Sequence, residues 1–196
     1  MRLFVAIDIS EPIRAAMRDY IERLQRAVPN ISAKWTRPEG WHLTLKFIGN
    51  TEKADEIKDL LSQIAGKPFS LSFRGVGFFT PRSPRVFFVD IQAPPELAKL
   101  ASQIENEVAK IGIEKEEPDY SPHLTLARFG SGRPDGSRKD RNQAKMYTLK
   151  QYLDEHPQLA QPDFGTMTAN EFFLYESKLN PKGSVYSKIA RYPLAV

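Results

Sequence analysis

The sequence predicts an α+β protein with two pseudo-symmetric lobes and largely antiparallel sheets. Two observations support this prediction: a strand–helix unit occurs twice, and strands and helices follow one another without the strict alternation of a parallel doubly wound sheet. Strands are expected where Phe, Val, Ile, Leu and Tyr are frequent and Gly and Pro flank the run, at about 2–9, 42–48, 69–79, 85–91, 123–129, 169–175 and 185–192.

The repeated unit is an apolar strand that ends in Asp-Ile, followed by a helix that starts near a proline. It reads FVAIDISEPIRAAMRDYIERLQRAV at residues 4–28 and VFFVDIQAPPELAKLASQIENEV at residues 86–108. The aspartate recurs at an offset of 82 residues, and the tetrapeptide His-Leu-Thr-Leu recurs at an offset of 81. We interpret residues 1–196 as a single two-lobed domain with an internal duplication, whose sequence halves are roughly 1–84 and 85–196.

Three longer helices are expected because apolar side chains recur at spacings of three and four residues, which places them on one helix face. The first helix follows Ser10, a suitable N-cap, and has Pro12 in its first turn. Gly112 can close the third helix. A short helix is expected around Thr148–Glu155, after a loop rich in Gly, Ser and charge at 130–141. The apolar positions are Ile13, Met17, Ile21, Leu24 and Val28, then Ile57, Leu60, Leu61 and Ile64, then Leu97, Leu100, Ala101, Ile104, Val108 and Ile111.

The composition is that of an ordinary soluble globular protein, with 41% hydrophobic and 27% charged residues. The absence of cysteine excludes disulfides, thiolate metal sites and a cysteine nucleophile. A net charge of +4 favours a polyanionic partner such as RNA, although many other proteins share this balance. Neither a signal peptide nor a membrane-spanning apolar run is evident, so a cytoplasmic protein without membrane association is expected.

The two His-Leu-Thr-Leu segments carry the candidate chemistry. Residues two apart in a strand share a face, so His42 projects beside Thr44 and His123 beside Thr125, while the leucines face the core. If the lobes face each other, two imidazoles and two hydroxyls converge in one cleft. One imidazole could then take a proton from water and the other could give one to a leaving oxygen, while the hydroxyls bind a phosphate.

No metal or cofactor is expected at this site. Neither motif histidine has a histidine or carboxylate at the spacing that a helical metal site requires, and no third ligand is apparent. The remaining histidine, His156, has no such context and is interpreted as a surface loop residue.

The segments WHLTLKFIG (41–49) and SPHLTLARFG (121–130) resemble the two signatures of the two-histidine phosphoesterases. Within that superfamily the chain is similar to the bacterial and archaeal RNA 2′,3′-cyclic phosphodiesterases, formerly called 2′-5′ RNA ligases. The opening MRLFVAIDI, the segment FRGVGFFTPRSPRVFFVDI (73–91) and the ending YESKLNPKGSVYSKIARYPL (175–194) share this resemblance. The likeness is weakest between residues 131 and 165.

The resemblance implies a bilobal α+β fold in which both motifs line a central cleft and the helices lie outside. It also implies an enzyme that opens a terminal 2′,3′-cyclic phosphate on RNA to a 2′-phosphate without a metal. Carried onto this chain, His42 would donate a proton to the departing 3′ oxygen and His123 would activate water. Thr44 and Thr125 would bind phosphate oxygens.

Arg128 is the fifth candidate, because the family commonly has an arginine after its second motif, where the first motif of this chain has Lys46. Strict alternation would turn Arg128 away from His123, so a bulge or a strand end would be needed to bring it to the phosphate. A surface salt bridge is the alternative role. Four aromatic residues near the motifs could stack on a base, although burial is expected for most of them: Trp41, Phe47, Tyr120 and Tyr186.

The substrate remains open at this level. The same groups could join 2′,5′ ends of RNA in the reverse reaction, or act on a small cyclic nucleotide. A non-catalytic RNA-binding module is a third possibility, suggested by the basic residues near 133–141. The expected partner is RNA with a 2′,3′-cyclic phosphate end, tRNA fragments included, and the chain is expected to be a monomer.

Overall fold

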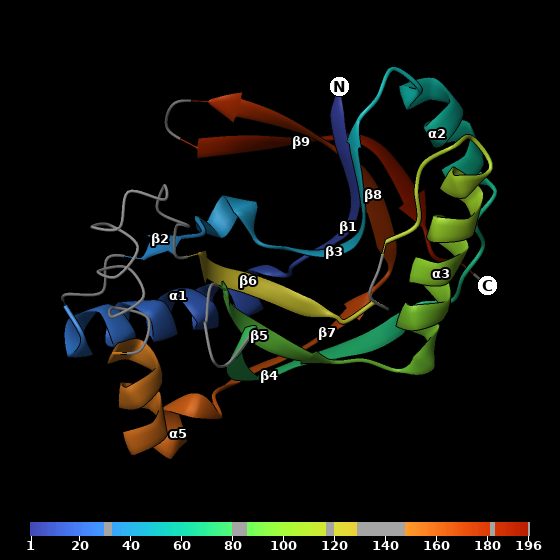
Figure 1. Cartoon of the computed structure of the whole chain (residues 1–196). Helices are drawn as coiled ribbons and strands as arrows, with labels where there is room; N and C mark the ends of the chain where they lie inside the picture. Colours follow the sequence, from blue (N-terminus) through green and yellow to red (C-terminus); the bar gives the residue numbers. More distant parts are fainter. Residues whose placement is uncertain (30–32, 80–85, 117–119, 129–147, 181–182, 196) are drawn as a thin grey trace.

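The computed structural model describes residues 1–29, 33–79, 86–116, 120–128, 148–180 and 183–195. Two antiparallel sheets form its framework, with helices on the outside (Figure 1). The strands are β1 (Arg2–Asp8), β2 (Lys34–Trp35), β3 (His42–Asn50), β4 (Phe69–Phe79), β5 (Val86–Gln92), β6 (His123–Arg128), β7 (Asp163–Ala169), β8 (Glu171–Asn180) and β9 (Gly183–Pro193). The helices are α1 (Glu11–Ala27), the short η1 (Pro38–Gly40), α2 (Ala54–Ser62), α3 (Pro95–Ala109) and α5 (Pro157–Ala160).

The predicted elements are present, and two strands were missed. Residues 148–155 form the expected short helix, whereas the loop expected at 130–141 lies outside the described residues. The two-residue strand β2 is too short to show any periodicity. The strand β7 was missed because its small and polar residues, with Gly165 at a φ of +104°, do not resemble a buried strand.

The strand order is β3-β1-β8-β9 in one sheet and β2-β6-β5-β4-β7 in the other. Each sheet therefore combines strands from both halves of the sequence, because β4 pairs with β5 and the β8–β9 hairpin completes the sheet that begins with β1. The spatial lobes are thus not the two sequence halves.

The strand pairs β1–β3 and β5–β6 have the same register. Asp8 lies opposite His42, and Asp90 lies opposite His123. Both pairs then shift register immediately after the motif threonine, so that Leu45 in β3 has no partner in β1. The corresponding unpaired residue in β6 is Leu126. These matching bulges are the structural counterpart of the repeated sequence.

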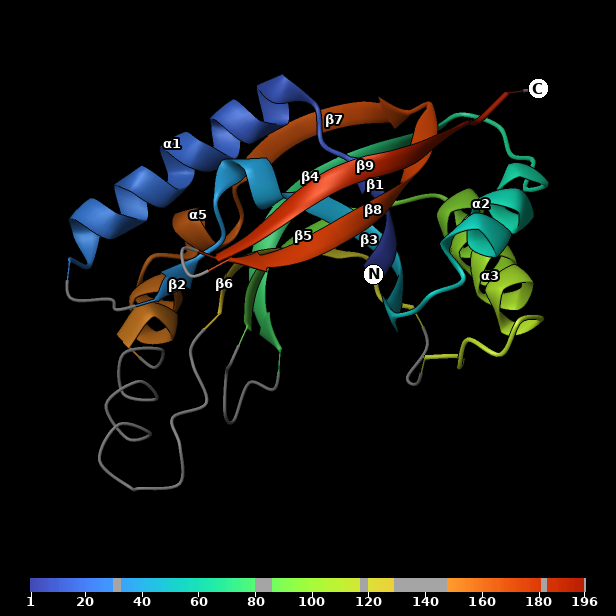
Figure 2. The same cartoon turned by 90° about the horizontal axis from the view of Figure 1, so that it is seen from above.

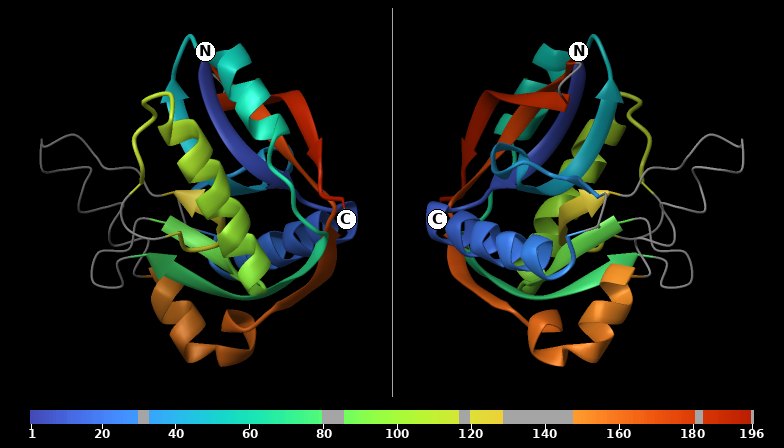
Figure 3. Two further views of the ribbon diagram at one scale, coloured as in Figure 1. Left: turned by 90° about the vertical axis from the view of Figure 1, so that its right-hand side faces the viewer. Right: turned by 90° about the vertical axis from the view of Figure 1, so that its left-hand side faces the viewer.

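The helices cover the two ends of the molecule (Figures 2 and 3). The helix α1 packs against β7, and α3 packs against β3 and α2. Their predicted apolar faces are buried, and one main hydrophobic core continues beneath both sheets. Among the described helices, none has an apolar stretch long enough to cross a lipid bilayer.

Among the described residues, one charged side chain is buried. Lys46 is only 1% exposed, and its ammonium donates hydrogen bonds to Glu105 Oε1 at 2.7 Å and to the Glu114 carbonyl at 2.6 Å. Because an unpaired buried charge is costly, this pairing ties β3 firmly to α3 and to the segment after it.

Candidate active site

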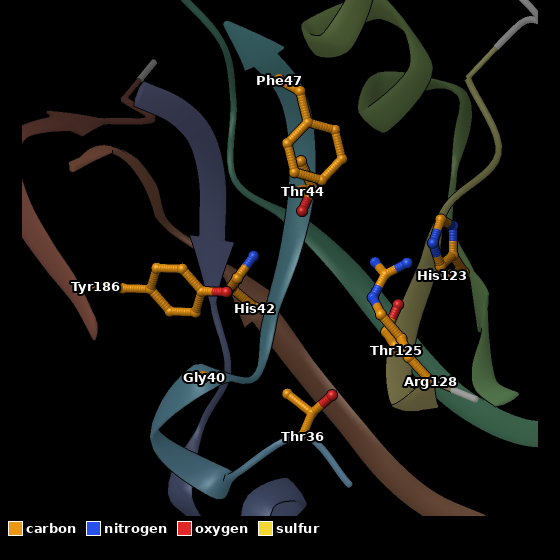
Figure 4. A pocket seen from close by; sticks show the side chains of 9 residues that line it. All are labelled: Thr36, Gly40, His42, Thr44, Phe47, His123, Thr125, Arg128 and Tyr186. Carbon is orange, nitrogen blue, oxygen red and sulfur yellow. The ribbon is translucent and has the colours of Figure 1, made fainter. Parts of the chain in front are cut away.

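A cavity with about 510 Å³ of free space lies where β3 and β6 approach each other. Figure 4 shows side chains from both strands projecting into it. All five residues predicted from the sequence line this cavity, namely His42, Thr44, His123, Thr125 and Arg128. The other residues that line it are Thr36, Gly40, Phe47 and Tyr186. The structure thus brings the two motifs together from different sheets.

The bulge in β6 directs Arg128 into the cavity. The paired register skips Leu126, and both Leu126 and Ala127 are completely buried. This extra residue reverses the alternation, so Arg128 shares the face of His123 and Thr125. In the part of the chain that the structure describes, Arg128 makes no ion pair with a carboxylate. The alternative of a surface salt bridge is therefore not supported.

The counterpart of Arg128 in the first motif is Phe47, not Lys46. The same bulge after Thr44 buries Lys46 and turns Phe47 toward the cavity, where its side chain is 52% exposed. The sequence comparison of Arg128 with Lys46 was wrong because the offset of 81 residues between the motifs matches Lys46 with Ala127 and Phe47 with Arg128. The two walls consequently differ at this position, with a cation on one and an aromatic ring on the other.

Each motif histidine hydrogen-bonds the backbone two residues earlier. His123 Nδ1 lies 2.9 Å from the carbonyl oxygen of Ser121, and the His42 ring hydrogen-bonds the backbone of Gly40. A carbonyl oxygen only accepts, so Nδ1 of His123 must carry the proton and Nε2 is left free. The His123 imidazole is therefore oriented as a base.

His42 is surrounded by aromatic rings. Its ring centroid lies 4.6 Å from that of Phe4, 5.2 Å from Tyr186 and 6.0 Å from Tyr175. Burial in this environment lowers the pKa of His42 to about 4, assisted by the positive charge of Arg14, although the Gly40 hydrogen bond works in the opposite direction. This pKa makes His42 neutral at pH 7.

The His123 ring is less enclosed than that of His42, but its pKa is also lowered. Its ring lies edge-on to Phe79, with the centroids 4.6 Å apart. Burial is the main cause that lowers the pKa of His123, and the nearby Arg128 guanidinium lowers it further, whereas the Ser121 hydrogen bond raises it. Burial therefore favours the neutral form of both imidazoles.

Comparisons with known proteins identify the family. A model of the 2′-5′ RNA ligase superfamily matches residues 11–176. The chain belongs to this superfamily. It is 33% identical to an RNA 2′,3′-cyclic phosphodiesterase of Archaeoglobus fulgidus over 192 residues, which cover 96% of this chain and 98% of that protein.

Solved structures show the same fold. The chain matches TT0787 of Thermus thermophilus with a TM-score of 0.74 and 27% identity, covering 99% of this chain and 98% of that one. It also matches E. coli LigT complexed with 3′-AMP, with a TM-score of 0.73, 25% identity and coverage of 100% and 98%. The family resemblance and the bilobal α+β fold expected from the sequence are confirmed.

In this member of the 2′-5′ RNA ligase superfamily, Arg14 holds the turn that presents His42. Its guanidinium donates to the carbonyl oxygens of Ile9 at 2.9 Å and Trp41 at 3.0 Å, and also to that of Pro38. It forms an ion pair with Asp8, the residue opposite His42 in β1. Because these bonds reach both sides of Gly40, they fix the backbone on which the His42 ring depends.

Asp8 binds a second cation, Lys188 of β9. Burial disfavours ionisation of Asp8, but the hydrogen bond and the charge of Lys188, together with Arg14, outweigh it and lower the pKa of Asp8. Among the residues that the structure describes, Asp90, the counterpart of Asp8, forms no ion pair, and Glu96 stands at the offset position of Arg14. In the described part of the chain, the backbone that carries His42 is therefore held by more polar contacts than the backbone that carries His123.

The four aromatic candidates and His156 lie in different places, some at the cavity and some away from it. Trp41 is 2% exposed and packs in the core, whereas Phe47 and Tyr186 line the cavity. Tyr120 faces a separate apolar recess, and His156 stacks on the ring of Tyr152 with centroids 4.2 Å apart. No group of three or more histidine and carboxylate side chains that could hold a metal occurs among the residues the structure describes.

Sequence reasoning missed Thr36 and Gly40. Thr36 reaches the cavity because β2 pairs with β6, with Lys34 opposite Arg128, and because the Thr36 amide donates to the Leu126 carbonyl at 2.8 Å. No sequence pattern signals this pairing. Gly40 could have been found from the repeat, since it precedes His42 by the same two residues as Ser121 precedes His123.

Proposed function

We propose that this chain hydrolyses the 2′,3′-cyclic phosphate at the end of RNA to a 2′-phosphomonoester, using His42 and His123 as the acid–base pair. One observation carries the proposal: equivalent histidines from two sheets line a single cavity together with two threonines and an arginine. The names of the curated relatives agree with this activity. The chemistry needs no metal, because each group that moves a proton or binds charge is a side chain of the cavity.

The reaction begins with in-line attack of water on phosphorus. Nε2 of His123 takes a proton from the water as the new P–O bond forms, and the P–O3′ bond breaks on the opposite side. His42 gives a proton to the departing 3′ oxygen, which leaves the phosphate on the 2′ oxygen. The charge on the non-bridging oxygens is stabilised by the guanidinium of Arg128 and the hydroxyls of Thr44 and Thr125.

The electrostatics of the protein groups suit His123 as the base, but His42 can act as the donor only if the bound substrate favours its protonation. With a pKa of about 4, protonation of His42 at pH 7 costs about 4 kcal/mol. A phosphate anion about 4 Å away offsets about 4 kcal/mol at an effective dielectric constant of about 20. Binding of the anionic substrate thus loads the proton donor.

The activity is tested with an RNA fragment that ends in a 2′,3′-cyclic phosphate, incubated with the protein in EDTA. The product should carry a 2′-phosphate, and His42→Ala and His123→Ala should each lower kcat by about 10²–10⁴-fold. His156→Ala is the matched control, because this histidine lies outside the cavity. Full activity in either motif variant, or a 3′-phosphate product, would contradict the assignment.

The same assay separates the alternatives. A ligase would consume a second RNA with a 5′ hydroxyl and form a 2′,5′ linkage through the same groups in reverse. An enzyme for small cyclic nucleotides would prefer a mononucleotide to an oligonucleotide. A binding module would retain RNA without any turnover, and its affinity would be unchanged in the double histidine variant. tRNA halves with cyclic phosphate ends are suitable first substrates.

A further inference from the structure

A larger groove opens from the edge of the catalytic cavity. It has about 1400 Å³ of free space, against about 510 Å³ in the cavity. The two recesses share Thr36, Gly40, Arg128 and Tyr186, which Figure 4 shows along one border of the cavity. The cavity and the groove therefore adjoin each other along these four residues.

The floor of the groove is held in place by the second sheet. Lys34 and Trp35 of β2 pair with Arg128 and Ala127 of β6. The Trp35 indole packs edge-on against Phe87 at 6.3 Å between ring centroids, so its position is fixed. The opposite wall is the start of β9, residues 183–186. The groove therefore runs between elements of the two sheets.

The charge of the groove favours a polyanion. Lys34 and Arg37 are exposed along it, and Arg128 lies at its inner end. Among the described residues that line it, Glu39 carries the one negative charge. Trp35 is half-buried and offers an aromatic surface beside these cations. Cations that follow a backbone, combined with an aromatic ring for stacking, are the features by which proteins hold single-stranded nucleic acid.

We propose that this groove binds the RNA strand on the 5′ side of the terminal cyclic phosphate, an inference that rests on the proposed function. The departing 3′ oxygen belongs to the terminal ribose, so the nucleoside lies on the side of His42 and the attacking water on the side of His123. Gly40 and Tyr186, the neighbours of His42, form the border between the cavity and the groove. The strand that precedes the ribose therefore enters the groove.

A second recess, of about 540 Å³, also opens from the side of His42, beside Phe47 and Arg2. It has less than half the free space of the groove and presents one cationic side chain. A single base fits these dimensions better than a strand does. The groove is consequently the better path for the chain of phosphates.

The test compares two substrates that share the same terminal nucleoside 2′,3′-cyclic phosphate: the mononucleotide and an oligoribonucleotide. Replacing two groove cations, Lys34→Gln with Arg37→Gln, should lower kcat/KM about tenfold for the oligonucleotide, mainly through KM, and leave the mononucleotide within about twofold. The salt dependence of oligonucleotide binding should become shallower by about 1.4 in the log–log slope for two lost phosphate contacts. Trp35→Leu should act in the same selective way through lost stacking.

The matched control removes two exposed cations elsewhere, Arg23→Gln with Lys99→Gln, and should leave both substrates unaffected. Thermal unfolding of each variant shows whether it remains folded at the assay temperature. If the wild type hydrolyses neither substrate, the proposed function fails and this inference fails with it. If the wild type hydrolyses both but the groove variants lose activity on both equally, or on neither, the groove does not bind the strand and the proposed function stands.

Discussion

His42, the proposed proton donor, should acquire its proton only when an anion occupies the cavity. Burial among Phe4, Tyr175 and Tyr186 lowers the pKa of His42 to about 4. That value lies about three units below pH 7, which corresponds to about 4 kcal/mol against the charged form. One negative charge at about 4 Å returns about the same amount. Binding of inorganic phosphate should therefore raise the pKa of His42 from about 4 to about 7.

The measurement is a pH titration of the imidazole signals by NMR, first without phosphate and then with saturating phosphate. The chain has three histidines, so the spectrum is simple to assign with single substitutions. His156 lies outside the cavity, and its signals serve as the internal reference for general effects of added salt. In Arg128→Gln the same shift should require a higher phosphate concentration, because the anion loses a charged partner.

Two results would refute this reasoning. The first is a His42 signal that is already protonated at pH 7 in the free protein, which would mean that burial does not control it. The second is a pKa of His42 that stays near 4 when phosphate is bound, although the protein hydrolyses its substrate at pH 7. In that case the donor role would have to pass to another group.

Three further predictions concern stability and the phosphate site. The pKa of His42 is about 4 in the folded protein and about 6.5 in the unfolded chain, so the unfolded state takes up this proton first as the pH falls below 6.5. Urea unfolding should therefore show up to about 3 kcal/mol of stability lost by pH 4, and a smaller loss in His42→Phe. Arg128→Gln should lower kcat roughly 10²-fold on every cyclic phosphate substrate, and the kcat of Arg128→Lys should be intermediate because lysine keeps the charge without the planar guanidinium. Equal activity of the two variants in steady-state assays would contradict this prediction. Lys46→Ala should lower the free energy of unfolding by about 3 kcal/mol in chemical denaturation, because it leaves Glu105 beside the core without its partner. Arg18→Ala breaks an exposed ion pair and should change the free energy of unfolding by less than about 1 kcal/mol.

The elements of this fold were largely predictable because each carries a local signal. The apolar face of α1 repeats at helical spacing, and the paired leucines of each motif indicate a strand buried on one side. The strand β2 had no such signal, since two residues show no period and the pairing with β6 depends on a segment more than 80 positions away in the chain. For the same reason Thr36 and the groove beside it could not be foreseen.

The chemistry that we propose for the site can be predicted from local sequence alone. Duplicated His-x-Thr segments on strands place an imidazole beside a hydroxyl whatever the surrounding fold, because alternation along a strand is a local property. The identity of the four principal side chains, His42, Thr44, His123 and Thr125, required nothing more.

The way these groups meet, and the side chains beside them, depend on contacts made only in the folded chain. The bulge at Leu126 turned Arg128 into the cavity, and its counterpart at Leu45 turned Lys46 into the core and Phe47 toward the cavity. Whether a strand bulges depends on its pairing with a neighbour, and the pKa of an imidazole depends on rings brought from distant segments. Both are properties of contacts across the folded chain, and the order of residues alone does not contain them.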